Sequence, residues 1–110
     1  MRPMDALPEI VREKLDDVRA LCEKHHVKRL VLFGSAVKGS FDPGRSDIDF
    51  LVEFLPDAPG KGFDHSHFVL RDELERLFRR EVDLVEPGAI TNPYVAESIR
   101  RDQLAIYDAA

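Results

Sequence analysis

The sequence has 110 residues, of which 44% are hydrophobic and 34% charged, with a formal net charge of −5; we expect one globular domain over residues 1–110. The acidic balance argues against stable nucleic-acid binding, and the single Cys22 cannot form an internal disulfide. No signal-peptide core is visible, and no apolar run approaches the ~18 residues that span a bilayer, so we expect no membrane association and a cytoplasmic protein.

The first half of the chain predicts a helix followed by two strands. Apolar side chains recur at three- and four-residue spacing from Val11 to Cys22, the pattern of an amphipathic helix with a buried, inert thiol. Pro43 and Gly44 mark a turn between the strands. The expected elements are a helix over residues 8–26, a strand over 29–33, a short helix over 35–38, a turn over 41–45 and a strand over 48–54.

The second half predicts a helix, a strand and a last helix. After a breaker-rich loop over residues 55–62, a helix is expected over 66–80 and a strand over 82–86. Asn92 is expected to cap the last helix, with Pro93 at its first position. Ile99, Leu104 and Ile106 should pack that segment onto the sheet. This order predicts an α/β (α+β) fold, in which a small mixed sheet carries helices on one face and leaves the other for a site.

Asp47 and Asp49 are the most informative side chains. Residues two apart in a strand share a face, so these carboxylates should project together, about 6–7 Å apart. Asp is uncommon in strands, and burying unpaired carboxylates is costly. Two of them on an otherwise apolar strand therefore call for a cation. Oxygen ligands of this kind suit Mg²⁺, which takes a few carboxylates together with substrate phosphates.

Gly34 and Ser35 directly follow the first strand, where a glycine allows a tight turn and a close approach to a ligand. A short helix opening at Ser35 would present free N–H groups to an anion. A third carboxylate, Asp83, lies in the strand-like run over residues 82–86. If that strand lies beside the one carrying Asp49, all three carboxylates join one cluster.

Other polar and aromatic residues leave alternatives open. Lys38 and Arg45 are either phosphate contacts or solvated surface charges. His65 and His67 have a spacing that allows metal binding, but without Cys partners a zinc site is not expected. Tyr94 is expected to pack rather than to stack on a base, as is Tyr107.

The chain resembles the minimal nucleotidyltransferases of the DNA polymerase beta-like superfamily. The resemblance rests on Leu32-Phe33-Gly34-Ser35, Ser46-Asp47-Ile48-Asp49 and Val82-Asp83-Leu84-Val85, and it extends to a terminal helical segment over residues 92–107. It implies a nucleotidyltransferase fold like the polymerase beta palm. Residues 36–46 make the spacing between the Gly-Ser pair and Asp47 one longer than is usual in the family, and we place the extra residue in the turn over 41–44.

The resemblance implies an enzyme that transfers NMP, with AMP from ATP as the leading choice, to a hydroxyl acceptor. Asp47, Asp49 and Asp83 would be catalytic and would hold two Mg²⁺ ions. The nucleotide would be bound by Gly34 and Ser35, together with Lys38, Arg45 and Ser46.

The resemblance also implies a partner. Since 27 residues follow Asp83 in this sequence, we expect a second copy or another protein to complete the site, in a homo- or hetero-oligomer. Minimal nucleotidyltransferases are typically antitoxins of helical HEPN-type toxins, which they can modify with AMP. The alternatives are an antitoxin that inhibits its partner by steric binding alone, and an enzyme that modifies a small molecule such as an aminoglycoside.

Overall fold

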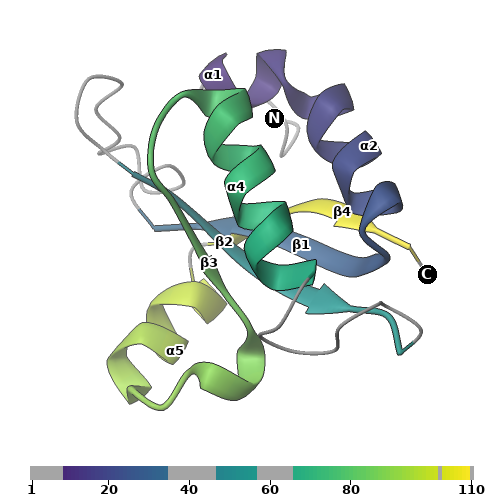
Figure 1. Ribbon diagram of the computed structural model, residues 1–110. Helices are drawn as coiled ribbons and strands as arrows, with labels where there is room; N and C mark the ends of the chain where they lie inside the picture. Colours follow the sequence, from purple (N-terminus) through teal and green to yellow (C-terminus); the bar gives the residue numbers. More distant parts are fainter. Residues whose placement is uncertain (1–8, 35–46, 57–65, 102, 110) are drawn as a thin grey trace.

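The computed structural model describes residues 9–34, 47–56, 66–101 and 103–109 (Figure 1). Within these ranges a four-stranded sheet has the order β3-β2-β1-β4. β1 is antiparallel to both β2 and β4, whereas β2 and β3 are parallel, so the sheet is mixed as predicted. The elements are α1 (Glu9–Glu13), α2 (Leu15–Lys24), β1 (Val27–Phe33), β2 (Ile48–Phe54), α4 (Ser66–Phe78), β3 (Val82–Val85), η2 (Pro87–Ala89), α5 (Pro93–Arg101) and β4 (Gln103–Asp108).

The expected first helix is divided at Lys14 into α1 and α2. Lys14 has φ −104° and ψ 10°, outside the helical range, and its N–H donates to the carbonyl of Val11 at 3.1 Å in a tight turn. The apolar stripe continues across the break, because Val11, Val18 and Cys22 are all buried. That continuity explains why periodicity alone predicted one helix. Cys22 is buried, as expected, and this burial raises the pKa of its thiol to about 12.

α4 ends at Phe78 rather than at Arg80, because Arg79 adopts a left-handed φ of 55°. Helices commonly end in such a residue, usually a glycine, so an arginine in this role gave no signal in the sequence. Leu70, Leu74 and Phe78 of this helix are buried.

The end of the chain corrects the sequence-based expectation. Asn92 caps α5 as predicted, since its Oδ1 accepts the N–H of Tyr94 at 2.8 Å. The helical segment expected over residues 92–107 nevertheless stops at Arg101, and β4 follows as a fourth strand beside β1. The alternation of Leu104 and Ile106 with more polar neighbours is the strand pattern that the helical interpretation overlooked.

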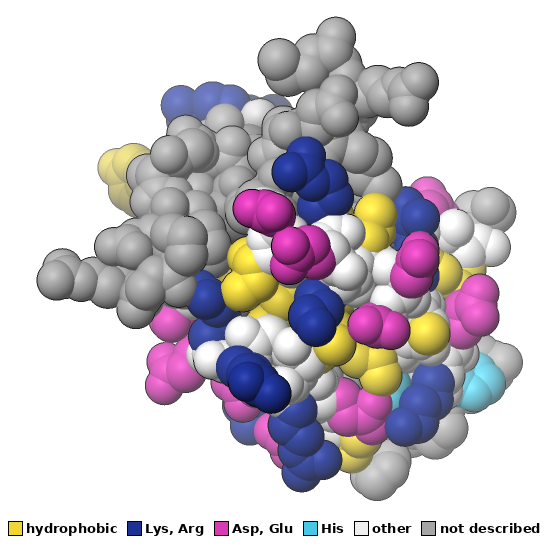
Figure 2. All heavy atoms as spheres, turned by 90° about the horizontal axis from the view of Figure 1, so that it is seen from above, with side chains coloured by type: hydrophobic (Ala, Val, Ile, Leu, Met, Phe, Trp, Pro, Cys, Tyr) yellow, Lys and Arg dark blue, Asp and Glu magenta, His cyan; other side chains and the backbone are white. Residues whose placement is uncertain are grey.

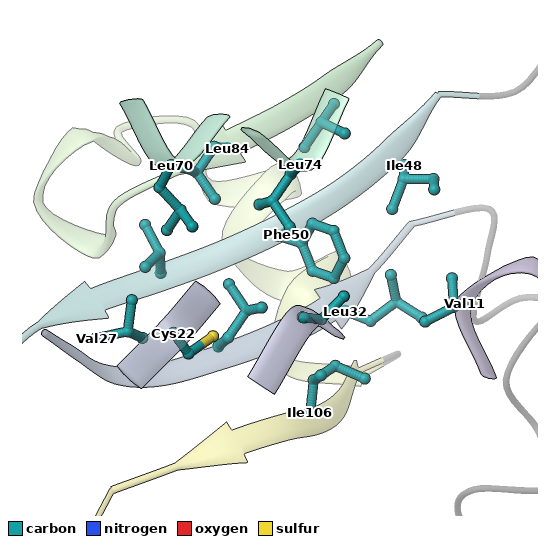
Figure 3. Packing of buried hydrophobic residues seen from close by; sticks show 14 of the residues in the cluster. Val11, Cys22, Val27, Leu32, Ile48, Phe50, Leu70, Leu74, Leu84 and Ile106 are labelled. Carbon is teal, nitrogen blue, oxygen red and sulfur yellow. The ribbon is translucent and has the colours of Figure 1, made fainter. Parts of the chain in front are cut away.

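The core lies between the sheet and its helical layer. Ile48, Phe50 and Val52 alternate along β2 and are fully buried. α4 lies over this side of the sheet (Figure 1), and its Leu74 packs in the same cluster as Phe50 (Figure 3). The rings of Phe50 and Phe78 are 6.2 Å apart between centroids. This packing fixes the register of β2, because a shift by one residue would turn its apolar side chains out of the core.

The opposite face of the sheet is partly covered. α5 lies on that side, away from α2 and α4 (Figure 1), and its Ile99 is buried. Val31 and Phe33 of β1 are also buried, although they do not belong to the main core cluster. None of the helices in the described ranges is long and apolar enough to cross a membrane.

Leu74→Ala should lower the free energy of unfolding by about 2–5 kcal/mol, since it leaves a cavity at a fully buried position. Leu77→Ala, the same change on the same helix, is the control and should cost less, because Leu77 is only partly buried. Urea unfolding followed by circular dichroism measures both. Equal losses would contradict the placement of this helix on the sheet.

Candidate functional site

The three predicted carboxylates come together at the starts of β2 and β3. Asp47 immediately precedes β2, and Asp49 is paired in register with Asp83 on the neighbouring strand. The N–H of Ile48 donates to the carbonyl of Glu81 at 3.2 Å, which ties the two strand starts together. Paired residues on neighbouring strands are about 4.8 Å apart, so the carboxylates of Asp49 and Asp83 are close neighbours.

A pocket of about 450 Å³ opens over these side chains. Its wall combines the strand starts with one side of α4, and the lining residues are Asp47, Asp49, Arg71, Glu75, Glu81, Val82 and Asp83. Glu75 also has a structural role, because its Oε2 accepts the N–H of Val82 at 3.1 Å and fixes the start of β3 against the helix. The pocket is therefore strongly acidic, and its position depends on the packing of α4.

Asp49 is the most perturbed carboxylate of the pocket. Burial and then the negative charges of Asp83 and Asp47 together raise its pKa to about 6. A carboxylate with such neighbours is stabilised either by a proton or by a cation. This is the electrostatic arrangement expected of a site that binds a divalent metal ion.

Gly34 is confined by its backbone and by Asp49. Its φ of +80° is a conformation that L-residues rarely adopt, and a Cβ at this position would collide with Asp49 Oδ2. The close approach arises because Phe33, the last residue of β1, is paired with Asp49. Gly34, the residue that follows β1, therefore lies directly beside the carboxylate site.

Three neighbouring strands thus place the parts of the site in one row. Gly34 lies at the end of β1, Asp49 on the central β2, and Asp83 on β3 at the edge of the sheet. Ser35, Lys38, Arg45 and Ser46 lie outside the described residues, so their predicted contacts with a nucleotide stay predictions.

The predicted metal ligands have the right chemistry for a cation but do not form a complete coordination shell by themselves. Within the described ranges, no three His, Cys, Asp or Glu side chains are arranged to hold a metal ion by themselves. Mg²⁺ normally keeps several waters and completes its shell with substrate phosphates, so it does not need a full protein cage. The oxygen-rich donors and the raised pKa of Asp49 fit such an ion.

Sequence reasoning missed Arg71, Glu75 and Glu81 as lining residues. Arg71 and Glu75 are four apart on α4 and so share a face beside the buried stripe of that helix. This spacing indicates one surface, but which strand that surface meets depends on how α4 packs. The sequence carried no signal for that.

Two other expectations have different outcomes. Tyr94 is 85% exposed, so the prediction that it packs is wrong, whereas Tyr107 packs against the core. His67 is buried, and its Nδ1 lies 2.9 Å from Glu86 Oε2, an interaction that accounts for the side chain without zinc. His65 lies outside the described residues.

A larger hollow of about 720 Å³ lies between α2 and α4. Its walls mix the charges of Asp17, Lys24, Glu73 and Arg76 with partly buried Leu21 and Leu77. Seen from the side of these helices, acidic and basic side chains are interspersed over the surface (Figure 2). This hollow lacks the concentrated charge of the carboxylate pocket, which makes the smaller pocket the better candidate site.

Comparison with known proteins agrees with this geometry. Residues 17–106 match the model of the nucleotidyltransferase domain family, and the chain belongs to that family. "Putative protein adenylyltransferase MJ0128" of Methanocaldococcus jannaschii is 36% identical over 106 residues, which cover 96% of this chain and 100% of the relative. The protein is therefore an enzyme of the nucleotidyltransferase class.

Solved structures have the same fold. A structure described as a "putative minimal nucleotidyltransferase" is 29% identical, with a TM-score of 0.69 over 87% of this chain and 92% of the other. A complex of tri-AMPylated Shewanella oneidensis HEPN toxin with MNT antitoxin includes a chain that is 16% identical, with a TM-score of 0.62 over 89% of this chain and 72% of the other. At that identity, the second similarity concerns the fold alone.

Gly34→Ala should destabilise the protein by about 1–3 kcal/mol, because of the left-handed φ and the clash with Asp49. It should also weaken binding of a nucleoside triphosphate, since it displaces the central carboxylate. Gly88→Ala is the control: no atom lies within 4 Å of the added Cβ, so its stability should change by less than about 0.5 kcal/mol. Denaturant titration and calorimetric nucleotide binding test both variants. Wild-type binding in Gly34→Ala would contradict the site.

Asp49→Asn should remove a pH-dependent loss of stability in the metal-free protein. The folded state raises the pKa of Asp49 from 3.8 to about 6. Between these two values the folded protein keeps a proton on Asp49 that the unfolded chain releases. The stabilisation is complete below the unfolded value and disappears as pH rises through about 6. In chelator, the melting temperature of Asp49→Asn should therefore exceed that of the wild type at about pH 8 and converge with it at about pH 4.

Asp16→Asn, which removes an exposed carboxylate outside the pocket, is the control and should follow the wild-type profile. Added Mg²⁺ should raise the melting temperature of the wild type at the higher pH, but not that of Asp49→Asn. Parallel pH profiles for the wild type and Asp49→Asn would show that this carboxylate is not strained in the fold.

Proposed function

We propose that the protein transfers AMP from ATP to a hydroxyl group of a partner protein, and that this partner is a helical HEPN-type toxin which the protein neutralises as an antitoxin. The observation that carries the proposal is the position of Asp49. It lies between the Gly34 turn on one side and Asp83 on the other, and burial and both neighbouring carboxylates raise its pKa.

The relatives support the direction of the proposal. The protein from Methanocaldococcus jannaschii is named for adenylyl transfer to protein, and it matches this chain over its full length. The MNT antitoxin with the same fold was seen with a HEPN toxin carrying AMP groups. We extend both features to this chain because it contains the carboxylates and the glycine turn of the site.

Different residues have different roles in the proposed reaction. The backbone at Gly34 and the hydroxyl of Ser35 hold the β- and γ-phosphates, with Lys38, Arg45 and Ser46 as further contacts to the nucleotide. Asp47, Asp49 and Asp83 would hold Mg²⁺, with two ions expected, and the metal would supply positive charge to neutralise the phosphates and the attacking oxygen. Asp83 lies on the acceptor side and accepts the proton of the attacking hydroxyl.

The transfer is a single displacement at the α-phosphorus of ATP. The acceptor oxygen forms a bond to the α-phosphorus, and the bond between that phosphorus and the bridging oxygen to the β-phosphorus breaks. Pyrophosphate leaves with the bonding electron pair, and the hydroxyl proton passes to the carboxylate of Asp83. Holding the reactants in line on adjacent strands is the main contribution of the protein.

The test combines the protein with a candidate partner, the product of a neighbouring gene of HEPN type. With ATP and Mg²⁺, intact mass spectrometry should show the partner gaining one or more AMP groups. Asp47→Asn should abolish the gain and leave the complex intact, since one exposed side chain at the pocket does not hold a whole interface.

Two other outcomes would replace the proposal. A complex that inhibits the partner without any mass change would identify a steric antitoxin. AMP transfer to an aminoglycoside or another small hydroxyl compound, with an unmodified partner, would identify a small-molecule nucleotidyltransferase.

A further inference from the structure

Arg71 is the one cation among the described residues that line the carboxylate pocket. It extends from α4 toward an acidic wall formed by Asp47, Asp49, Glu75, Glu81 and Asp83. Despite this surplus of negative charge, no ion pair joins Arg71 to any of these five carboxylates in the described part of the chain. The guanidinium is therefore kept beside the carboxylates without being neutralised by them.

The contacts that Arg71 does make orient it but leave donors unused. Its guanidinium carbon lies 5.2 Å from the centroid of the Phe68 ring, a cation–π contact. A terminal nitrogen is 3.5 Å from Asp72, a long ion pair at the surface. Nε is buried and has no hydrogen-bond partner within the described residues. A buried N–H without a partner is costly, and bound substrate would supply the missing acceptor.

The position of Arg71 indicates which substrate it meets. Gly34 approaches Asp49 from the β1 side, whereas Asp83 lies on the opposite side, on the edge strand. Arg71 lines the same pocket one helical turn before Glu75, whose Oε2 accepts the N–H of Val82 at the start of β3, so Arg71 lies on the β3 side of the pocket. The triphosphate belongs at the glycine turn, so the end of the pocket at Arg71 is left for the acceptor.

We propose that Arg71 binds an oxyanion, a carboxylate or a phosphate, carried by the acceptor beside its reacting hydroxyl. A guanidinium only donates hydrogen bonds, and its planar fork matches these two groups. Stacking on Phe68 holds the fork in place before the acceptor arrives, which lowers the entropic cost of binding. This inference rests on the proposed function and adds that the acceptor is selected by its negative charge.

The first experiment separates acceptor binding from nucleotide binding. Arg71→Ala should raise the KM for the HEPN-type partner about tenfold or more, the loss expected for a charged hydrogen bond. The Kd for the ATP analogue AMP-PNP with Mg²⁺ should stay at the wild-type value. Arg71→Lys should recover only part of the loss, because it keeps the charge without the fork.

Arg76→Ala is the matched control. Arg76 lies on the same helix but lines the hollow toward α2, so both constants should remain unchanged. Phe68→Leu removes the stacking ring and keeps the guanidinium, and it should give a smaller rise in KM. Thermal melting of every variant shows whether the fold is retained.

The second experiment needs no acceptor. Inorganic phosphate is titrated into the protein loaded with Mg²⁺ and AMP-PNP, and the NMR signal of the Arg71 Nε–H is followed. Arg71→Lys assigns that signal, and chloride at equal ionic strength is the control. Phosphate should shift the signal without displacing the nucleotide.

The outcomes decide between the two proposals. A higher Kd for AMP-PNP in Arg71→Ala would place Arg71 on the triphosphate and overturn the inference, as would an unchanged KM for the partner. A wild-type protein that transfers no AMP would remove the proposed function instead. In that case the phosphate titration still tests the anion site, and an unmoved Nε–H signal would overturn it.

Discussion

Side-chain alternation along β2 is the constraint on which the site depends. Ile48, Phe50 and Val52 face the helical layer and are fully buried, so Asp49 must point to the other face. There it meets Asp83 across the sheet and Gly34 at the end of β1. Asp49 cannot retreat from its like-charged neighbour without shifting β2, and a shift would unpack Phe50. The core thus holds a carboxylate where its raised pKa shows that it is poorly solvated.

The pairing of the strands also sets the order of the site residues across the sheet. β1, β2 and β3 lie side by side, so the glycine turn, the central carboxylate and the outer carboxylate follow one another across the sheet. α4 adds Arg71 and Glu75 to the wall of the pocket beside β3. In the reaction that we propose, nucleotide and acceptor approach the central carboxylate from opposite sides. Transfer chemistry requires that arrangement, in which attacking and leaving oxygens lie on opposite sides of one phosphorus.

Sequence and structure differ where local signals are weak or ambiguous. The break at Lys14 interrupts neither the apolar stripe nor the charge pattern, so periodicity could not find it. Arg79 ends α4 in a conformation usually taken by glycine. The resemblance predicts helix through residue 107, whereas pairing with β1 makes the end of this segment the strand β4. In each case a tertiary contact or a backbone conformation outweighs residue preference.

The sequence by itself determined the mixed fold, the strand that carries Asp47 and Asp49, the third carboxylate Asp83 and the glycine turn, because periodicity and backbone freedom are local properties. Tertiary structure alone decided that Asp49 and Asp83 are paired in register and that a Cβ at Gly34 would strike Asp49. It also decided that Arg71 joins their pocket. Those facts depend on how strands and helices far apart in the chain pack against one another, and no local pattern encodes that packing.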